Sequence, residues 1–276
     1  MALTVNTNLS SMLVQRNMNA STTALNTAIQ RMTTGYRINS AKDDAAGMAV
    51  AIKLDTQLSS YDVASQNVQM GSSLLTTLEE NNNLVLGHLQ RIRDLAEQSS
   101  NGVYDKSAQD AIAAEITARM NEIDRLAKSV EFNGKNLMDG TKTINIQVGI
   151  NGTADDRIAI GDATGDTKVS TLFDGTYSAG NQITAAGSAA LSVIDTAIDT
   201  MKTRMTKIGA LQNRLDSAAE SIEVARSNVS SALSTVRDAD VSTESSNYIK
   251  AQILQQAAAS LLTTANQTPS IALNLI

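Results

Sequence analysis

The stretch that decides the fold is Leu191–Val236, which reads LSVIDTAIDTMKTRMTKIGALQNRLDSAAESIEVARSNVSSALSTV. It contains no Pro, and its apolar residues recur in alternating steps of three and four, interrupted only by Gln212 and Arg226. A mean step of 3.5 residues is the coiled-coil period. The stretch therefore predicts one helix of about 65–70 Å, whose apolar stripe packs on another long helix, in this chain or in a neighbouring subunit. The stripe consists of Leu191, Ile194, Ile198, Met201, Met205, Ile208, Leu215, Ala219, Ile222, Val229, Leu233 and Val236.

A second Pro-free stretch, from Ala45 to about Ser100, carries the same pattern. Its stripe is comparable in length with the first, so the two are natural partners in one coiled coil. Each stripe includes an amide side chain, Asn82 or Gln212. Such an amide either fixes the register of the helices at some cost in stability or lies at an exposed end of the stripe. The second stripe consists of Tyr61, Ala64, Val68, Gly71, Leu75, Leu78, Asn82, Val85, Leu89, Ile92 and Ala96.

Composition excludes several classes of function. The 276 residues have a formal net charge of -6 and no Cys, and His88 is the one histidine. An acidic chain lacks the concentrated basic surface that nucleic acid requires. Without Cys or a second His there is no thiol catalysis, thiolate metal site or H-E-x-x-H motif, so we expect no metal and no cofactor. No apolar run reaches the ~18 residues of a membrane span, and the N-terminus has neither the basic start nor the apolar core of a secretory signal.

Both ends of the chain are predicted to be helical. The N-terminal helix takes Asn6 or Asn8 as its N-cap and ends at Gly35, and the C-terminal helix ends at Pro269. Neither has enough apolar surface to be stable alone, so we expect the two to pair and to form an assembly core. The residues predicted for that core are Val14, Met18, Leu25, Ile29, Met32, Ile253, Leu254, Leu261 and Leu262. The apolar tail, residues 271–276, is expected to be buried as well.

The middle of the chain changes character twice. Asn101-Gly102 ends the second long helix, and a capping box at Ser107 opens a shorter helix with Ile112, Ile116, Met120 and Ile123 on one face. Farther on, Ile144, Ile146, Val148 and Ile150 alternate with polar residues before Asn151-Gly152, and Ile158 and Ile160 follow. Alternation of period two around Asn-Gly predicts a β-hairpin. Residues 161–187 are rich in Gly, Asp, Thr and Ser, and we expect turns there with one more short strand at most.

Five stretches together resemble the bacterial flagellins. They are RINSAKDDAAG (Arg37–Gly47), LQRIRDLAEQSS (Leu89–Ser100), EITARMNEIDRLAKSVEFNGKNLMDG (Glu115–Gly140), GALQNRL (Gly209–Leu215) and SNYIKAQILQQAAASLLTTANQ (Ser246–Gln267). They occur in the family's order and cover about the first 140 and the last 90 residues. Only about 50 residues separate the helical parts, too few for a further domain of ~100 residues. The chain thus resembles a minimal flagellin without large outer domains.

The predicted fold is mainly α: a long antiparallel helical hairpin or coiled-coil rod with a small β-hairpin region, and with both termini helical and paired. Residues 1–44 and 236–276 are expected to form a terminal coiled-coil domain that serves as filament core. Residues 45–235 are expected to form a helical rod domain with its β-hairpin region at about 141–187. Apolar stripes on such termini favour head-to-tail contacts between copies, and non-closing contacts of this kind build helical filaments.

The resemblance implies more than the pattern does. It implies a structural subunit that polymerises into the bacterial flagellar filament for swimming motility, with no enzymatic activity. It also implies export to the cell exterior through the flagellar type III apparatus without a cleavable signal peptide. The partners that it implies are an export chaperone, the filament cap and hook-associated proteins. The alternative is a hook–filament junction protein or another flagellar axial protein, which shares the logic of paired termini.

The resemblance also implies recognition by the innate immune Toll-like receptor for flagellin. The family's contact positions correspond here to Gln90, Arg91, Leu95, Gln98, Ile112, Glu115 and Arg119. Arg91 is a typical interface anchor, because its planar guanidinium offers five donors. The same residues also lie where subunits are expected to stack, so assembly would hide the receptor site.

Overall fold

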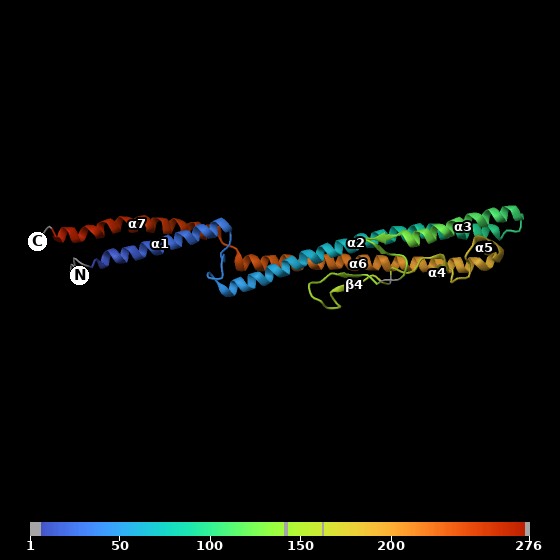
Figure 1. Ribbon diagram of the computed structural model, residues 1–276, viewed down its shortest axis with the longest axis horizontal. Helices are drawn as coiled ribbons and strands as arrows, with labels where there is room; N and C mark the ends of the chain where they lie inside the picture. Colours follow the sequence, from blue (N-terminus) through green and yellow to red (C-terminus); the bar gives the residue numbers. More distant parts are fainter. Residues whose placement is uncertain (1–6, 141–142, 162, 274–276) are drawn as a thin grey trace. The chain divides into compact units, whose positions relative to one another are not determined.

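The computed structural model describes residues 7–140, 143–161 and 163–273, with side chains to Gln267 (Figure 1). Within them the chain is mainly helical, as predicted. The elements are α1 (Leu9–Thr34), α2 (Ala45–Ser99), α3 (Lys106–Ser129), β1 (Glu131–Phe132), β2 (Lys135–Asn136), β3 (Asn145–Gln147), β4 (Arg157–Ala159), α4 (Val169–Leu172), α5 (Gly180–Ala186), α6 (Ser188–Arg237) and α7 (Val241–Leu273).

The chain divides into two compact units. We call Met1–Leu58 with Asn228–Ile276 the terminal unit and Ser59–Ser227 the central unit. These boundaries fall inside α2 and α6. The sequence predicts a different division, with its boundaries at the polar connectors. It assigns 1–44 and 236–276 to the filament core and 45–235 to the rod, and this assignment stays a prediction.

The terminal unit consists mainly of α1 and α7, which lie side by side and antiparallel (Figure 1). Asn8 caps α1, because its Oδ1 accepts a hydrogen bond from the backbone N–H of Ser11 at 3.0 Å. Gly35 ends α1 with a φ of 74°, a conformation that favours glycine. Both ends of α1 are therefore as predicted. The Asn8 amide also donates to the Ala265 carbonyl of α7 at 2.8 Å.

The two polar connectors pair with each other inside the terminal unit. The backbone N–H of Arg37 donates to the Arg237 carbonyl at 2.7 Å, and that of Ala239 donates to the Gly35 carbonyl at 2.9 Å. The Arg237 guanidinium stacks 3.9 Å from the centre of the Tyr36 ring, a cation–π contact. The chain thus enters and leaves the terminal helix pair through a short antiparallel bridge.

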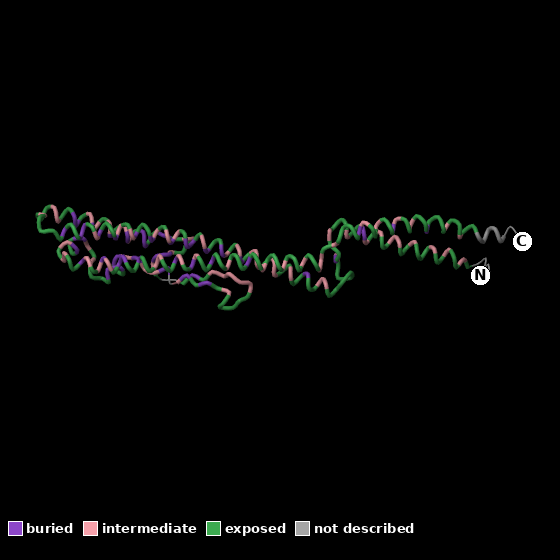
Figure 2. The backbone as a smooth tube through the Cα atoms, turned by 180° about the vertical axis from the view of Figure 1, so that it is seen from behind, coloured by how far each residue is buried: buried purple, intermediate pink, exposed green. Residues whose placement is uncertain are grey.

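In the central unit, α2 and α6 run antiparallel over a shared apolar core (Figure 2). Residues farther along α2 contact residues nearer the start of α6, so the two helices are antiparallel. Three side-chain contacts show this: Asp62 with Arg226 at 2.7 Å, Glu79 with Gln212 at 2.8 Å, and Arg93 with Asp195 at 2.7 Å. From Ala64 to Ala96 each predicted stripe position of α2 is buried, and Tyr61 is half-buried.

The apolar stripe predicted for α6 is partly wrong, because one section of the helix faces the core with neighbouring residues. Leu211 is buried and Ala218 half-buried, whereas Gln212, which interrupts the predicted stripe, is half-buried and the predicted Ala219 is exposed. The Gln212 amide donates to the Glu79 carboxylate instead of entering the core. A polar end that has a partner outside the core avoids the cost of burial, so Leu211 takes the inner position.

Helix α3 begins one residue earlier than its predicted cap. Its N-cap is Asp105 rather than Ser107, and the Asp105 carboxylate accepts from the Ala108 N–H at 2.9 Å. A carboxylate at this position also interacts favourably with the helix dipole. The predicted apolar face of α3 is confirmed, since Ile112, Ile116, Met120 and Ile123 are all buried.

The predicted β-hairpin is confirmed, although its connection is longer than a tight turn. Strands β3 and β4 pair antiparallel with Ile146 opposite Ile158, and residues 148–156 connect them. A further hairpin, β1–β2, escaped prediction. It turns at Asn133-Gly134, both with positive φ (49° and 72°), as a two-residue hairpin turn requires.

Two short helices, α4 and α5, stand where turns and a strand were expected. They are held by side chains of α3: the Asp124 carboxylate accepts from the Val169 N–H at 2.8 Å, and the Thr117 hydroxyl accepts from the Gly180 N–H at 2.9 Å. Each of these donors is the first N–H of its helix, which has no partner within the helix itself. Helix α3 thus supplies the N-terminal acceptors for both.

The predicted end of the last helix is also wrong, because α7 runs through Pro269 to Leu273. Proline lacks the N–H donor and crowds the preceding turn, but its fixed φ is helical, so a helix can continue through it at a cost. The side chains of the apolar tail, residues 271–276, which were predicted to be buried, lie outside those that the structure describes.

Candidate functional site

The fully buried positions of the seam between α1 and α7 are two alanines and a glutamate on α7 and one alanine on α1. On α7, Glu244, Ala251 and Ala258 are buried, and half-buried residues continue the same spacing of three and four. On α1, Ala28 is the buried residue. The half-buried seam residues are Ser11, Val14, Met18, Ser21 and Leu25 on α1, and Tyr248, Gln255, Leu262 and Ala265 on α7. The intrachain seam therefore uses little of the apolar surface that the two helices carry.

Many of the larger apolar side chains of the two helices are exposed. Most residues of α1 and α7 are exposed, in contrast to the buried core of the central unit (Figure 2). Ile253 is 59% exposed and Leu261 is 58% exposed. The exposed large apolar residues of the pair are Leu9, Met12, Leu13, Ile29 and Met32 on α1, and Ile249, Ile253, Leu254 and Leu261 on α7.

The residues predicted for the assembly core therefore divide into two groups. Val14, Met18, Leu25 and Leu262 are half-buried in the α1–α7 seam. The others, Ile29, Met32, Ile253, Leu254 and Leu261, are exposed on the outside of the pair. Several further exposed residues were not predicted, and Leu9, Met12 and Leu13 are the largest of them on α1. A search for apolar residues alone would have found these three, which stand one to five residues ahead of Val14.

One side of the helix pair is hollowed into a groove of about 730 Å³. Small and polar residues line it together: Ala20, Ser21, Thr23, Ala24, Thr27, Ala28 and Arg31 on α1, and Glu244, Asn247, Lys250, Ala251 and Leu254 on α7. Small residues leave space between helices that a larger side chain from another helix can fill, as a knob fills a hole.

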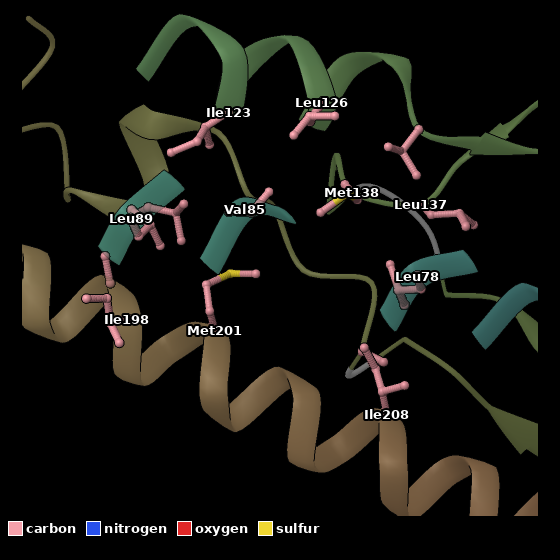
Figure 3. Packing of buried hydrophobic residues seen from close by; sticks show 14 of the residues in the cluster. Leu78, Val85, Leu89, Ile123, Leu126, Leu137, Met138, Ile198, Met201 and Ile208 are labelled. Atoms are coloured by element: carbon pink, nitrogen blue, oxygen red, sulfur yellow. The ribbon is translucent and has the colours of Figure 1, made fainter. Parts of the chain in front are cut away.

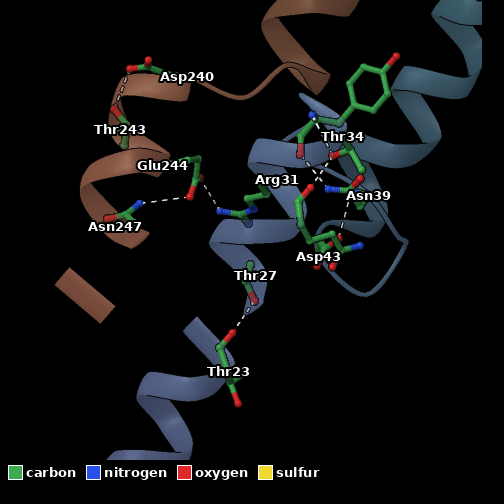
Figure 4. A network of polar contacts seen from close by, with 12 residues as sticks. Thr23, Thr27, Arg31, Thr34, Asn39, Asp43, Asp240, Thr243, Glu244 and Asn247 are labelled. Carbon is green, nitrogen blue, oxygen red and sulfur yellow. Dashed lines mark hydrogen bonds and ion pairs between the residues drawn. The ribbon is translucent and has the colours of Figure 1, made fainter. Parts of the chain in front are cut away.

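A polar network closes the end of the pair near the connectors (Figure 4). The Arg31 guanidinium contacts the Glu244 carboxylate at 3.0 Å, and Asn247 donates to the other oxygen of that carboxylate at 3.4 Å. Asp240 starts α7 by accepting from the Thr243 hydroxyl at 2.7 Å, and this hydrogen bond lowers the pKa of the Asp240 carboxyl. The network sets the register of the two helices.

In the central unit, part of the predicted receptor-contact set forms a charged cluster across α2 and α3. The Glu115 carboxylate accepts from Arg91 Nε and from Arg119 Nη2, each at 3.1 Å. The hydrogen bond from Arg91 has the largest effect on the Glu115 carboxyl, followed by the one from Arg119, and both lower its pKa. The carboxylate therefore holds both guanidinium groups in place on an exposed surface.

The other members of that set lie in different surroundings. Gln90 and Gln98 are exposed, and the Gln98 amide donates to the Tyr104 hydroxyl at 3.0 Å. Leu95 and Ile112 are buried in the core instead. Two residues outside the predicted set contact its members: Tyr104, and His88, whose Nδ1 lies 3.5 Å from Arg119 Nη1. Contacts between helices have no signature in the spacing along one helix.

Nothing else in the described residues suggests catalysis. No group of three or more His, Asp or Glu among them is placed to hold a metal ion. Likewise, none of the described helices is both long and apolar enough to span a membrane. Long antiparallel helix pairs, one of them with its large apolar side chains outside, define a helical structural protein.

Comparison with known proteins gives the family. The N-terminal helical region of bacterial flagellin matches residues 5–143, and the C-terminal helical region of bacterial flagellin matches residues 191–276. The chain therefore belongs to the bacterial flagellin family, as the sequence motifs indicated. This is a family of structural filament proteins and not of enzymes.

Relatives match along almost the whole chain. A flagellin of Halalkalibacterium halodurans is 34% identical over 275 residues, which cover 99% of each chain. A flagellar filament core protein of Treponema maltophilum is 32% identical over 272 residues, which cover 95% of each. A solved structure from Vibrio parahaemolyticus, assigned to the flagellar hook-associated proteins, has a TM-score of 0.60 at 16% identity, covers 71% of this chain and 100% of its own, and shows a shared fold.

Proposed function

We propose that this filament subunit polymerises through its terminal unit, with residues 1–44 and 236–276 as the filament core. Family membership makes the chain a structural subunit of the bacterial flagellar filament. The observation that carries the proposal is the outward apolar surface of the α1–α7 pair, typified by Ile253 and Leu261. A soluble monomer gains nothing from exposing such a surface, whereas contact with further copies would bury it.

The physical driving force for this assembly is apolar burial. Fully burying a large aliphatic side chain contributes about 1.5–3 kcal/mol, and each subunit exposes several on both helices. The groove offers a place for such a side chain from a neighbouring copy. A groove that accepts a side chain of the next copy makes a heterologous contact, and repetition of such a contact gives an open helical polymer where the rotation between copies does not close a ring.

Point variants test the proposal without removing the helices. Replacing Ile253 and Leu261 together by Ser should abolish growth of filaments from added seeds, as seen by electron microscopy. Leu84→Ser is the matched control, because Leu84 is also an exposed large apolar residue but lies in the central unit. Circular dichroism should show unchanged helix content in both proteins. Equal growth by the double variant and the control would place the filament core elsewhere.

We further propose that the Arg91–Glu115–Arg119 cluster is the part of the central unit that the Toll-like receptor for flagellin contacts. The geometry supports this, because Glu115 holds Arg91 at 3.1 Å on an exposed face, which reduces the entropy lost when a partner binds. Gln90, Leu95, Gln98, Ile112 and Arg119 complete the proposed set, with Leu95 and Ile112 supporting the surface from beneath.

A reporter-cell assay tests the receptor proposal. Arg91→Ala should weaken receptor activation by purified monomer while leaving the fold intact. Arg125→Ala is the control, because Arg125 is an exposed arginine of α3 that pairs with Glu122 outside the cluster. Undiminished signalling by the Arg91 variant would show that the receptor does not contact this cluster.

The proposed partners follow from the same exposed surface. We expect an export chaperone to cover the apolar face of α7 before assembly, and the filament cap and hook-associated proteins to contact the subunit at the filament ends. The proposed destination is the cell exterior, reached through the type III apparatus without a cleavable signal peptide. A hook–filament junction role is the alternative, and failure of the purified chain to grow on filament seeds would favour it.

A further inference from the structure

The sequence places three asparagines in a row on α2, and only the middle one is buried. Asn83 is exposed, and Asn81 is half-buried with its amide donating to the Thr77 carbonyl at 2.8 Å. Asn82 is 1% exposed, and neither its Oδ1 nor its Nδ2 has a hydrogen-bond partner among the described residues. Most buried polar groups in proteins have a partner, so this exception requires an explanation.

Buried apolar side chains lie on both sides of Asn82 along α2. Leu78 and Val85, about one helical turn to either side on α2, are buried. Figure 3 shows both of them in a core completed by α3, with Ile123 and Leu126, by α6, with Met201 and Ile208, and by Met138. The amide therefore occupies a stripe position that an aliphatic side chain would fill without any unpaired polar atom.

We infer that Asn82 is a built-in weak point, at which α2 separates from the elements packed against it more readily than elsewhere in the central unit. The reason is a difference between two states. In the closed state the amide has lost water without gaining a protein partner, whereas local opening returns it to water. The equilibrium thus shifts toward the open state by the cost of the unpaired amide, which corresponds to roughly five- to a hundredfold. This inference is independent of the proposed function.

The consequence is a core whose stability is uneven. Opening near residue 82 would loosen α3, the segment around Met138 and the facing part of α6 together, because all share the core at this level. Regions that open with low free energy are the ones drawn on in conformational change. A single residue would thereby make the central unit easier to rearrange than its long apolar stripes suggest.

Hydrogen exchange on the full chain tests the inference. Asn82→Leu keeps the branch at Cγ and removes both polar atoms, so it should slow exchange of the protected backbone amides of α2 around residue 82 by about tenfold or more. Asn83→Leu makes the same substitution one residue along, on the exposed face, and should change exchange by less than about twofold. Exchange by the Asn82→Leu variant that is as fast as the wild type, or faster, would overturn the inference.

A second variant covers the case in which leucine fits poorly. Asn82→Asp puts a carboxyl in the same apolar site, where burial raises its pKa above the ordinary value. The folded state then binds the proton more tightly than the unfolded state, so the stability of this variant should fall as the pH rises through the raised pKa. Asn83→Asp should show no such fall. If both aspartate variants follow the wild-type profile, the site at residue 82 is hydrated or partnered and the inference is wrong.

Discussion

Arg31 of α1 and Glu244 of α7 form an ion pair at 3.0 Å across the seam between the two helices. The Glu244 side chain is only 9% exposed, and its carboxylate accepts hydrogen bonds from this partner and from Asn247. A buried pair of this kind contributes more to register and orientation than to net stability. We therefore regard it as the contact that aligns the terminal helices before they assemble.

Breaking that pair should misalign the terminal unit. Arg31→Glu places two carboxylates together and should lower the thermal stability of grown filaments, by about 1–3 kcal/mol per subunit from the lost charged hydrogen bonds. The double variant with Arg31→Glu and Glu244→Arg should recover most of the loss. Scanning calorimetry of filaments measures both. Additive damage in the double variant would show that the two residues do not act as a pair.

The Glu115 cluster should affect the stability of the protein at acid pH. Arg91 and Arg119 lower the pKa of Glu115 below its ordinary value, so the folded state favours the ionised carboxylate. The contribution is present above the unfolded-state pKa and is lost as the pH falls through the lower folded-state pKa. Thermal melts at a series of acid pH values should therefore show a smaller acid-induced loss for Glu115→Gln than for the wild type. Parallel profiles for the two proteins would contradict the prediction.

Arg204 of α6 fastens the loop before α4. Its guanidinium donates to the carbonyls of Gly165 and Asp166, at 3.0 Å and 2.7 Å, and burial lowers its pKa. Arg204→Ala leaves both carbonyls without these donors and should cost about 1–3 kcal/mol, measured by denaturant unfolding. Gly165→Ala should also destabilise, because a Cβ there would collide with the guanidinium. Proteolysis confined to the loop in both variants would support the fastening role, and unchanged resistance would refute it.

Sequence periodicity predicted the parts of the fold that depend on one helix at a time. The α2 stripe follows from its own spacing, because each member faces the same core. The choice between Leu211 and Gln212 on α6 depends instead on Glu79, a partner on another helix. Contacts between elements decide such details, and a pattern within one element does not contain them.

The same reason explains the missed short helices. Helices α4 and α5 obtain their first acceptors from Asp124 and Thr117 of α3, distant residues that no local capping motif can indicate. The assembly surface was partly predictable, since Ile253 and Leu261 belong to an apolar face in the sequence. Which apolar residues face the partner helix and which face outward depends on how α1 and α7 pair, and the structure was needed to separate them.

The central claim is that the termini drive polymerisation, and electron microscopy of seeded growth tests it most directly. The purified full chain should be compared with a version that lacks residues 237–276, after filament seeds are added to each. The account predicts filaments from the full chain and none from the truncated one. If the full chain stayed monomeric, or if the truncated chain polymerised equally well, the account would be contradicted.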